Sequence, residues 1–144
     1  MPDKIHLTVA TVVKRDNLFL MVKETEFGRS VINQPAGHVE PGEDIIDAAI
    51  RETYEETGSK AEIIMPYTMF SLPHINQVHM FYLANLLDDN FGPTVESSEV
   101  KLFKNNEILW DEIAFPTVEK TLKYYLEDLE KDNFIFREED IKLW

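Results

Sequence analysis

Three glutamates occur at spacings that would bring them together on one side of a helix. Glu52, Glu55 and Glu56 are related as i, i+3 and i+4, so at about 100° per residue they fall within an arc of about 100°. Like charges about 4 Å apart repel by roughly 4 kcal/mol at an effective dielectric of 20, so the cluster destabilises a helix unless a metal ion or the neighbouring Arg51 sits among them. Oxygen ligands without cysteine suit Mg²⁺ or Mn²⁺. The pattern therefore predicts a divalent-metal site.

The segment from residue 37 to residue 59 resembles the signature of the Nudix hydrolases, G-x5-E-x7-R-E-U-x-E-E-x-G-U, in which U is a bulky aliphatic residue. The two aliphatic positions depart from the signature because they hold Thr53 and Ser59. We expect this departure to weaken the packing under the helix while leaving the metal-binding groups intact. Seven identities at fixed separations make a coincidental acidic helix a poor explanation. The glycine and charged positions are all occupied, by Gly37, Glu43, Arg51, Glu52, Glu55, Glu56 and Gly58.

The resemblance implies an enzyme that cleaves the phosphoanhydride bond of a nucleoside diphosphate linked to another group. Metal in such a site neutralises phosphoryl charge and orients a water for in-line attack. Glu52, Glu55 and Glu56 would supply the ligands, and the resemblance adds the backbone carbonyl of Gly37. Arg51 is expected to orient a carboxylate through a bidentate pair rather than to contact substrate. Within the signature segment, residues 37–59, which we call the box, catalytic roles are thus assigned to Arg51, Glu55 and Glu56.

Further charged candidates lie outside the metal-binding pattern. A general base is expected within the box or in a downstream loop, where Glu96 and Glu99 precede a predicted strand. Either could serve, and a solvated loop charge is an equally good interpretation of each. Lys23 could contact a phosphate or simply face solvent. Glu43 lies about 180° from Glu52 on the helical wheel, so it is predicted to cap the helix or to pair with arginine.

Planar side chains are the candidates for binding a nucleobase, because bases stack on aromatic rings. Most of them are expected to belong to the core. His38, within the box, is interpreted as a loop hydrogen-bonding group rather than a metal ligand. The base-binding candidates are Phe70, His74, Phe81, Trp110 and Phe115. The predicted substrate-binding residues are Lys23, Phe70, His74 and Trp110.

The apolar and turn-forming residues predict an α/β fold with a mixed sheet and helices on both faces. The first helix should present Ile46, Ala49, Ile50, Thr53 and Thr57 to the core, on the side opposite its glutamates. The Nudix resemblance implies the same α/β/α sandwich. Strands are predicted over residues 6–13, 18–22, 31–34, 61–72, 78–87 and 100–103, and helices over 43–57 and 117–131, with a hairpin joining the first two strands.

Length and composition narrow the classes of protein and partner. At 144 residues and 44% hydrophobic content, the chain suits one Nudix hydrolase domain over residues 1–144. A net charge of −13 argues against a nucleic-acid polymer, which needs clustered lysine and arginine. The absence of cysteine and of a long apolar stretch favours a cytoplasmic protein without a membrane contact. The expected partner is a small nucleoside diphosphate derivative, and a homodimer is compatible with the sequence.

Two subgroup resemblances point to different substrates. The N-terminal segments HLTVATVV and NQPAGHVE resemble bacterial Nudix phosphatases that act on nucleoside tri- and diphosphates and thiamine-type pyrophosphates. The C-terminal half, from SLPHINQVHMFYLANL onward, is similar to Nudix pyrophosphatases of ADP-ribose or FAD. Because that half would shape the substrate pocket, the ADP-ribose or FAD reaction is favoured and the phosphatase reaction is the alternative. A non-catalytic domain that senses a nucleotide is an alternative of another class, but such domains usually lose box glutamates.

Overall fold

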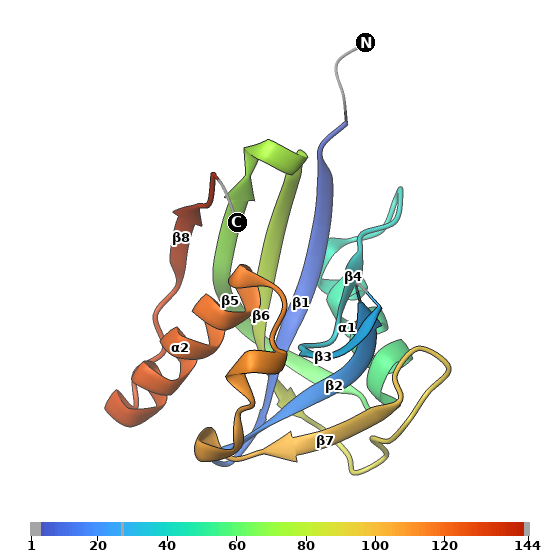
Figure 1. Ribbon diagram of the computed structural model, residues 1–144, viewed down its shortest axis with the longest axis vertical. Helices are drawn as coiled ribbons and strands as arrows, with labels where there is room; N and C mark the ends of the chain where they lie inside the picture. The colour runs from blue at the N-terminus through green and yellow to red at the C-terminus, as the bar shows by residue number, and fades with distance from the viewer. Residues whose placement is uncertain (1–3, 27, 143–144) are drawn as a thin grey trace.

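The computed structural model describes residues 4–26 and 28–142, and its strands form one eight-stranded mixed sheet (Figure 1). The strand order is β3-β2-β1-β6-β5-β8, with β4 paired to β1 and β7 paired to β2. The β1–β6 and β5–β8 pairs are parallel, and the other pairs are antiparallel. The strands are β1 (His6–Arg15), β2 (Leu18–Glu26), β3 (Arg29–Asn33), β4 (Ala36–His38), β5 (Ala61–Leu72), β6 (Gln77–Leu86), β7 (Glu99–Phe103) and β8 (Arg137–Asp140).

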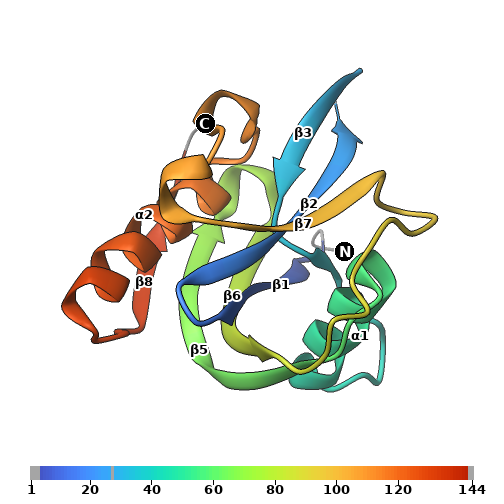
Figure 2. The same cartoon turned by 90° about the horizontal axis from the view of Figure 1, so that it is seen from below.

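Two helices, α1 (Ile45–Thr57) and α2 (Pro116–Lys131), cover opposite faces of the sheet, as the two views in Figures 1 and 2 show. The side chains of β1 contribute alternately to the core under α1 and to the core under α2, because successive side chains of a strand point to opposite faces. Val9 packs with Ala49 of α1, whereas Ala10 belongs to the cluster that includes Leu122 of α2. The predicted α/β/α sandwich is therefore confirmed. Neither helix is long and apolar enough to cross a bilayer, for the residues described.

The predicted strands and helices are all present, and most boundaries differ by a few residues. Arg15 pairs with Leu18 across a tight turn, which confirms the hairpin between the first two strands. Helix α1 ends where predicted, at Gly58, whose positive φ of 81° suits glycine. It begins at Ile45 rather than at Glu43, because Asp44 is extended. Strands β4 and β8 were not predicted, since the first is only three residues long and the second is highly charged.

The prediction for the core-facing side of α1 was wrong in two respects. Ile46 is 44% exposed, because small side chains form the contact surface of α1 and leave Ile46 outside. Glu56 lies on the buried side, so the core face and the glutamate face are not opposed. The buried residues of α1 are Ala48, Ala49, Thr53, Glu56 and Thr57.

The two departures from the aliphatic pattern, Thr53 and Ser59, are both fully buried. The Thr53 hydroxyl lies 2.7 Å from the carbonyl oxygen of Ala49 and 2.7 Å from the hydroxyl of Thr11 on β1. Since Thr53 donates to the carbonyl, the Thr11 hydroxyl donates to Thr53. A polar contact thus replaces an aliphatic one between α1 and the sheet, with the Thr53 hydroxyl satisfied.

Candidate metal centre and substrate cleft

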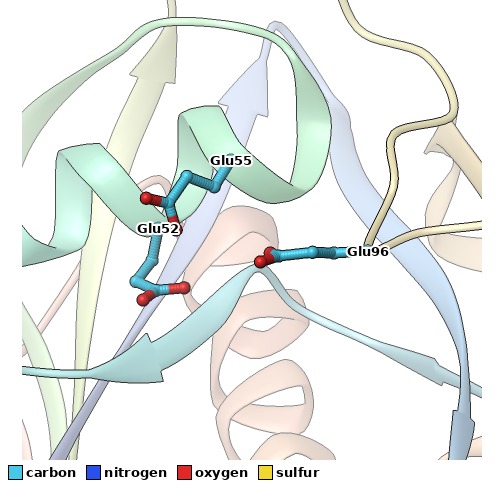
Figure 3. A group of neighbouring side chains, drawn as sticks. All are labelled: Glu52, Glu55 and Glu96. Atoms are coloured by element: carbon cyan, nitrogen blue, oxygen red, sulfur yellow. The ribbon is translucent and has the colours of Figure 1, made fainter.

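Three carboxylates converge at one end of α1. Glu52 and Glu55 come from the helix, and Glu96 comes from the loop before β7 (Figure 3). Each offers an oxygen atom, and these three atoms all lie within 4.8 Å of one another. Three hard anionic oxygens without sulfur or imidazole are a donor set that fits Mg²⁺ or Mn²⁺. The structure therefore joins Glu96 to two of the three predicted metal-binding glutamates.

Glycine at position 37 makes room for one of these carboxylates. Gly37 pairs with Val9 in the β1–β4 ladder, and a Cβ atom added to it would lie 2.0 Å from the carboxyl carbon of Glu52. Such a separation is far below van der Waals contact. The glycine is therefore required by the close approach of the Glu52 side chain, and any larger residue would move that carboxylate.

Arg51 holds the carboxylates in place from one side. Its Nε and Nη2 atoms donate to the two oxygens of Glu43 at 2.7 and 2.9 Å, and these bonds lower the pKa of Glu43 to about 2. Its Nη1 atom donates to Glu52 at 2.7 Å and to Glu55 at 3.2 Å, and Nη2 also reaches the carbonyl of His38. Glu43 thus pairs with arginine, as its position on the helical wheel predicted.

Glu56 is not among the three carboxylates whose oxygens lie within 4.8 Å of one another, although the charges of Glu52 and Glu96 act on it, and its role as a metal ligand stays a prediction. It is only 8% exposed, because it projects from the buried side of α1, and its Oε2 atom accepts the Ala36 N–H at 3.1 Å. Burial raises the pKa of Glu56 to about 9, and the charges of Glu24, Glu52 and Glu96 add to this rise against the hydrogen bond from Ala36. A divalent cation nearby would offset both effects.

A cleft of about 400 Å³ begins beside this acidic region. Gly37, Glu24 and Glu56 line one end of it, and no lysine or arginine is among its lining residues in the part of the chain described. A phosphate in this cleft would therefore depend on a bound cation for its positive charge. The other end is lined by Ile75, Gln77, His79, Phe81, Phe115, Thr117 and Val118.

Two predicted residues lie away from the acidic cluster. Lys23 and Glu99 are register partners in the β2–β7 pair and line a small hollow of about 50 Å³ that shares no lining residue with the cleft. Lys23 and Glu24 are consecutive on a strand, so their side chains point to opposite faces. The structure therefore places Glu24, which the sequence analysis missed, at the cleft instead of Lys23. Strand alternation was the signal that could have identified it.

The three aromatic or imidazole residues predicted to bind substrate do not line the cleft. Phe70 is 1% exposed and packs edge-on against Phe81, with ring centroids 5.9 Å apart. Trp110 packs against the main core, with the Lys123 amine 5.8 Å from its ring. His74 lies in the short 3₁₀ turn Pro73–Ile75. These three predictions are corrected, because tertiary packing decides which aromatic faces reach a cleft. Two other base-binding candidates, Phe81 and Phe115, do line it.

Comparisons with known proteins agree with this geometry. The chain matches the NUDIX domain family over residues 4–129. A Nudix hydrolase from Nitrosomonas europaea is 35% identical and superposes with a TM-score of 0.95, over 99% of this chain and 82% of that one. Phosphatase NudJ from Escherichia coli K12 is 51% identical over 59 residues, which are 41% of this chain and 39% of NudJ.

The chain thus spans about two fifths of the length of the curated relatives it matches. An ADP-ribose pyrophosphatase from Streptococcus suis is 17% identical with a TM-score of 0.70, over 94% of this chain and 98% of that one. At that identity the likeness is one of fold alone. The box residues, the α/β/α sandwich and the match over most of the described residues together show that the chain belongs to the Nudix family.

Proposed function

We propose that the protein hydrolyses a phosphoanhydride bond of a nucleoside diphosphate derivative with the help of Mg²⁺ or Mn²⁺. The convergence of Glu52, Glu55 and Glu96 carries this proposal. The Glu52 carboxylate lies against Gly37, which also lines the cleft. A diphosphate in the cleft would therefore lie within reach of a cation held by these carboxylates.

Each residue of the site has a distinct role in this proposal. Glu52, Glu55 and Glu96 hold the metal, which neutralises phosphoryl charge and lowers the pKa of a bound water. The box resemblance adds the carbonyl of Gly37 and the carboxylate of Glu56 as ligands. Arg51 fixes the orientation of Glu52 and Glu55. Glu55, Glu56 and Glu96 are the candidates to accept the proton of the attacking water, because each is a carboxylate at or beside the metal position.

Two substrate classes follow from different similarities. The C-terminal half resembles pyrophosphatases of ADP-ribose or FAD, and this reaction would release AMP and a second phosphate ester. A phosphatase acting on nucleoside tri- or diphosphates or thiamine pyrophosphate is the second candidate. The 51% identity with Phosphatase NudJ over 59 residues favours it. The likeness to the Streptococcus ADP-ribose pyrophosphatase extends to the fold only.

A substrate panel with Mg²⁺ tests the proposal and separates the two classes. The panel holds ADP-ribose, FAD, NADH, diadenosine polyphosphates, nucleoside triphosphates, ADP and thiamine pyrophosphate. AMP released from ADP-ribose or FAD supports the pyrophosphatase, whereas phosphate released from ADP supports the phosphatase. Turnover should vanish with chelator and return with Mg²⁺ or Mn²⁺. Full turnover by metal-stripped protein in excess chelator would refute the metal role, and binding without turnover would indicate a nucleotide sensor.

A pair of glycine variants tests the metal position independently of substrate. Gly37→Ala should displace the Glu52 carboxylate and weaken Mn²⁺ binding by about tenfold or more, because one ligand is lost. Gly92→Ala is the matched control, since an added Cβ there meets nothing within 4 Å. Isothermal titration with Mn²⁺ and thermal melting measure the two effects. Equal Mn²⁺ affinity in both variants would contradict the proposed position of the metal.

A further inference from the structure

The end of the cleft away from the glutamates carries a short chain of hydrogen-bonding side chains. Gln77 and His79 lie two residues apart on β6, so they point to the same face, and Thr117 lies in the first turn of α2. The His79 Nε2 atom is 2.8 Å from Oε1 of Gln77, and its Nδ1 atom is 3.0 Å from the Thr117 hydroxyl. All three side chains line the cleft.

The direction of these bonds follows from the chemistry of the groups. The Gln77 Oε1 atom can only accept, so Nε2 of His79 carries the proton and Nδ1 accepts from the Thr117 hydroxyl. Burial, together with the charge of His38, lowers the pKa of His79 to about 4, so its ring is neutral near pH 7. Thr117 is fully buried, so the pattern leaves Gln77 to face a ligand, with its amide N–H groups as donors and the second lone pair of its Oε1 atom as an acceptor.

The surroundings of this chain are mostly apolar, and His38, which also lines the cleft, is the titratable group whose charge acts on His79. Ile75, Phe81, Phe115 and Val118 line the same end of the cleft. The carboxylates that line the cleft, Glu24 and Glu56, come from β2 and α1 and not from the elements that carry this chain. A charged ligand group at the apolar end would lose hydration without gaining an opposite charge. A flat, neutral group with both a hydrogen-bond donor and an acceptor fits these surroundings.

We propose that Gln77, held by His79 and Thr117, determines specificity by binding the polar edge of an uncharged nitrogen heterocycle whose diphosphate lies at the acidic cluster. This inference rests on the proposed function. Gln77 donates to an acceptor of the ring and accepts from a ring N–H or amino group. His79 and Thr117 are positioning residues, because the two hydrogen bonds of the His79 ring fix the orientation of the Gln77 side chain. Diphosphates without such a ring would not form these hydrogen bonds or the apolar contacts, and should therefore bind more weakly.

Paired substrates separate ring recognition from phosphate chemistry. ADP, ADP-ribose and thiamine pyrophosphate carry a nitrogen heterocycle, and methyl diphosphate carries none. The wild-type protein should prefer at least one ring-bearing compound over methyl diphosphate by about tenfold or more in kcat/KM. Thr117→Val and Gln77→Leu should each lower kcat/KM for that compound by about tenfold, mainly through KM, since each removes one hydrogen bond. Both should leave methyl diphosphate unchanged within about twofold.

Three further variants distinguish positioning from structural damage. His79→Phe keeps a ring but removes both nitrogens, so it should raise KM for the ring-bearing compound while kcat stays near the wild-type value. Thr117→Ser keeps the hydroxyl and should restore the wild-type preference. Thr121→Val is the matched control one turn along α2, where the hydroxyl contacts Thr68 at 2.8 Å. It should change stability without changing the ratio between the two substrates.

The outcomes separate this inference from the proposed function. Two results would overturn the inference while metal-dependent turnover of methyl diphosphate continues. One is a wild-type protein that shows no preference for a ring-bearing compound. The other is a Thr117→Val variant whose kcat/KM falls equally for both substrates. If no diphosphate is hydrolysed, the proposed function fails. Calorimetric titration with AMP then decides, because equal affinity in the wild type and in Thr117→Val overturns the inference and a weakened affinity in the variant supports it.

Discussion

Two buried carboxylates, Glu56 on α1 and Asp128 on α2, have opposite surroundings. Asp128 is 1% exposed and receives two hydrogen bonds from Arg137 at 2.8 and 2.6 Å, with further bonds from the Tyr67 hydroxyl and the Ile135 N–H. Glu56 is almost as buried, but it accepts a hydrogen bond from the backbone N–H of Ala36, and the charges that act on it are those of the carboxylates Glu24, Glu52 and Glu96. One carboxylate is neutralised by the fold and the other is not.

The pKa values of the two groups follow this difference. Burial raises the pKa of Asp128, but the hydrogen bonds from Arg137, Tyr67 and Ile135 outweigh it, so the pKa lies below its ordinary value. Burial raises the pKa of Glu56 to about 9, and neighbouring charges add to the rise. A buried carboxylate without a cation of its own is costly to the fold. Asp128 thus has an arginine as its partner in the fold, whereas Glu56 lines the cleft, which is the position expected of a carboxylate with a role in the proposed reaction.

The largest expected effect is on turnover. Glu56→Gln should lower kcat by a factor on the order of 10² to 10⁴, the range for a lost metal-activation or proton-transfer role. Steady-state kinetics with Mg²⁺ measures this loss. Glu43→Gln is the comparison variant, because Glu43 accepts hydrogen bonds from Arg51 and the Glu40 N–H and is not one of the clustered carboxylates, so the loss of turnover should be smaller. An equal or greater loss for Glu43→Gln, or near-normal turnover with unchanged Mn²⁺ affinity for Glu56→Gln, would contradict this assignment.

The corresponding change at the other carboxylate should act on stability alone. Asp128→Asn removes the charge that pairs with Arg137 and should lower the free energy of unfolding by about 3 kcal/mol. Urea denaturation measures it. Mn²⁺ affinity should not change, because the site and the ion pair share no residue. Combining Asp128→Asn with Arg137→Met should recover part of the loss, and a double variant less stable than Asp128→Asn alone would argue against the ion pair as the cause.

The two groups should also give opposite pH dependences in metal-free buffer. The folded-state pKa of Glu56 is raised, so the folded state binds the extra proton and its stability falls as the pH rises from about 4.5 toward 9. The pKa of Asp128 is lowered, so its contribution is present above about pH 4 and is lost as the pH falls further. Urea denaturation from pH 5 to pH 9 should show the stability gap between Glu56→Gln and the wild type widening in favour of the variant. A constant gap would refute the raised pKa.

The smallest effect concerns the hydroxyl pair beneath α1. Thr53→Val leaves the Thr11 hydroxyl without its acceptor and should lower the free energy of unfolding by about 1 to 2 kcal/mol. Thr11→Val should cost less, because Thr53 still donates to the Ala49 carbonyl. The double variant should regain much of the loss, as a double-mutant cycle by thermal or urea unfolding would show. Additive losses would mean that the two hydroxyls do not depend on each other.

Local patterns in the sequence were sufficient to predict helix α1 and the hairpin between β1 and β2. Fixed spacing between Arg51 and the glutamates identified the helix, and the polar break after Arg15 identified the hairpin. The sequence could not show that Glu96 rather than Glu99 joins the cluster, because the direction of a loop side chain depends on how β7 pairs with β2. The cleft end formed by β6 and α2 was also missed, since Gln77 and Thr117 become neighbours only through tertiary packing.

The rotation of α1 is a further example of a feature set by packing. The periodic isoleucines predicted a core face that includes Ile46, but alanines and threonines form the contact with the sheet. A helical wheel identifies an apolar side and does not say how closely a helix approaches a sheet. For the same reason it could not show that Glu56 lies on the buried side of the helix.

The parallel pairing of β1 with β6 bears on how the protein folds. It runs from His6 with Gln77 to Lys14 with Asn85, so closing it joins segments far apart in the chain, which slows folding. Gly37 and Glu52, by contrast, are close in sequence and can meet early. During synthesis Gly37, Glu52 and Glu55 emerge before β6, whereas Glu96, the third carboxylate of the cluster, emerges after it. The proposed metal site is thus complete only after β6 and the loop that follows it have been synthesised, while α2 still lies ahead in the chain.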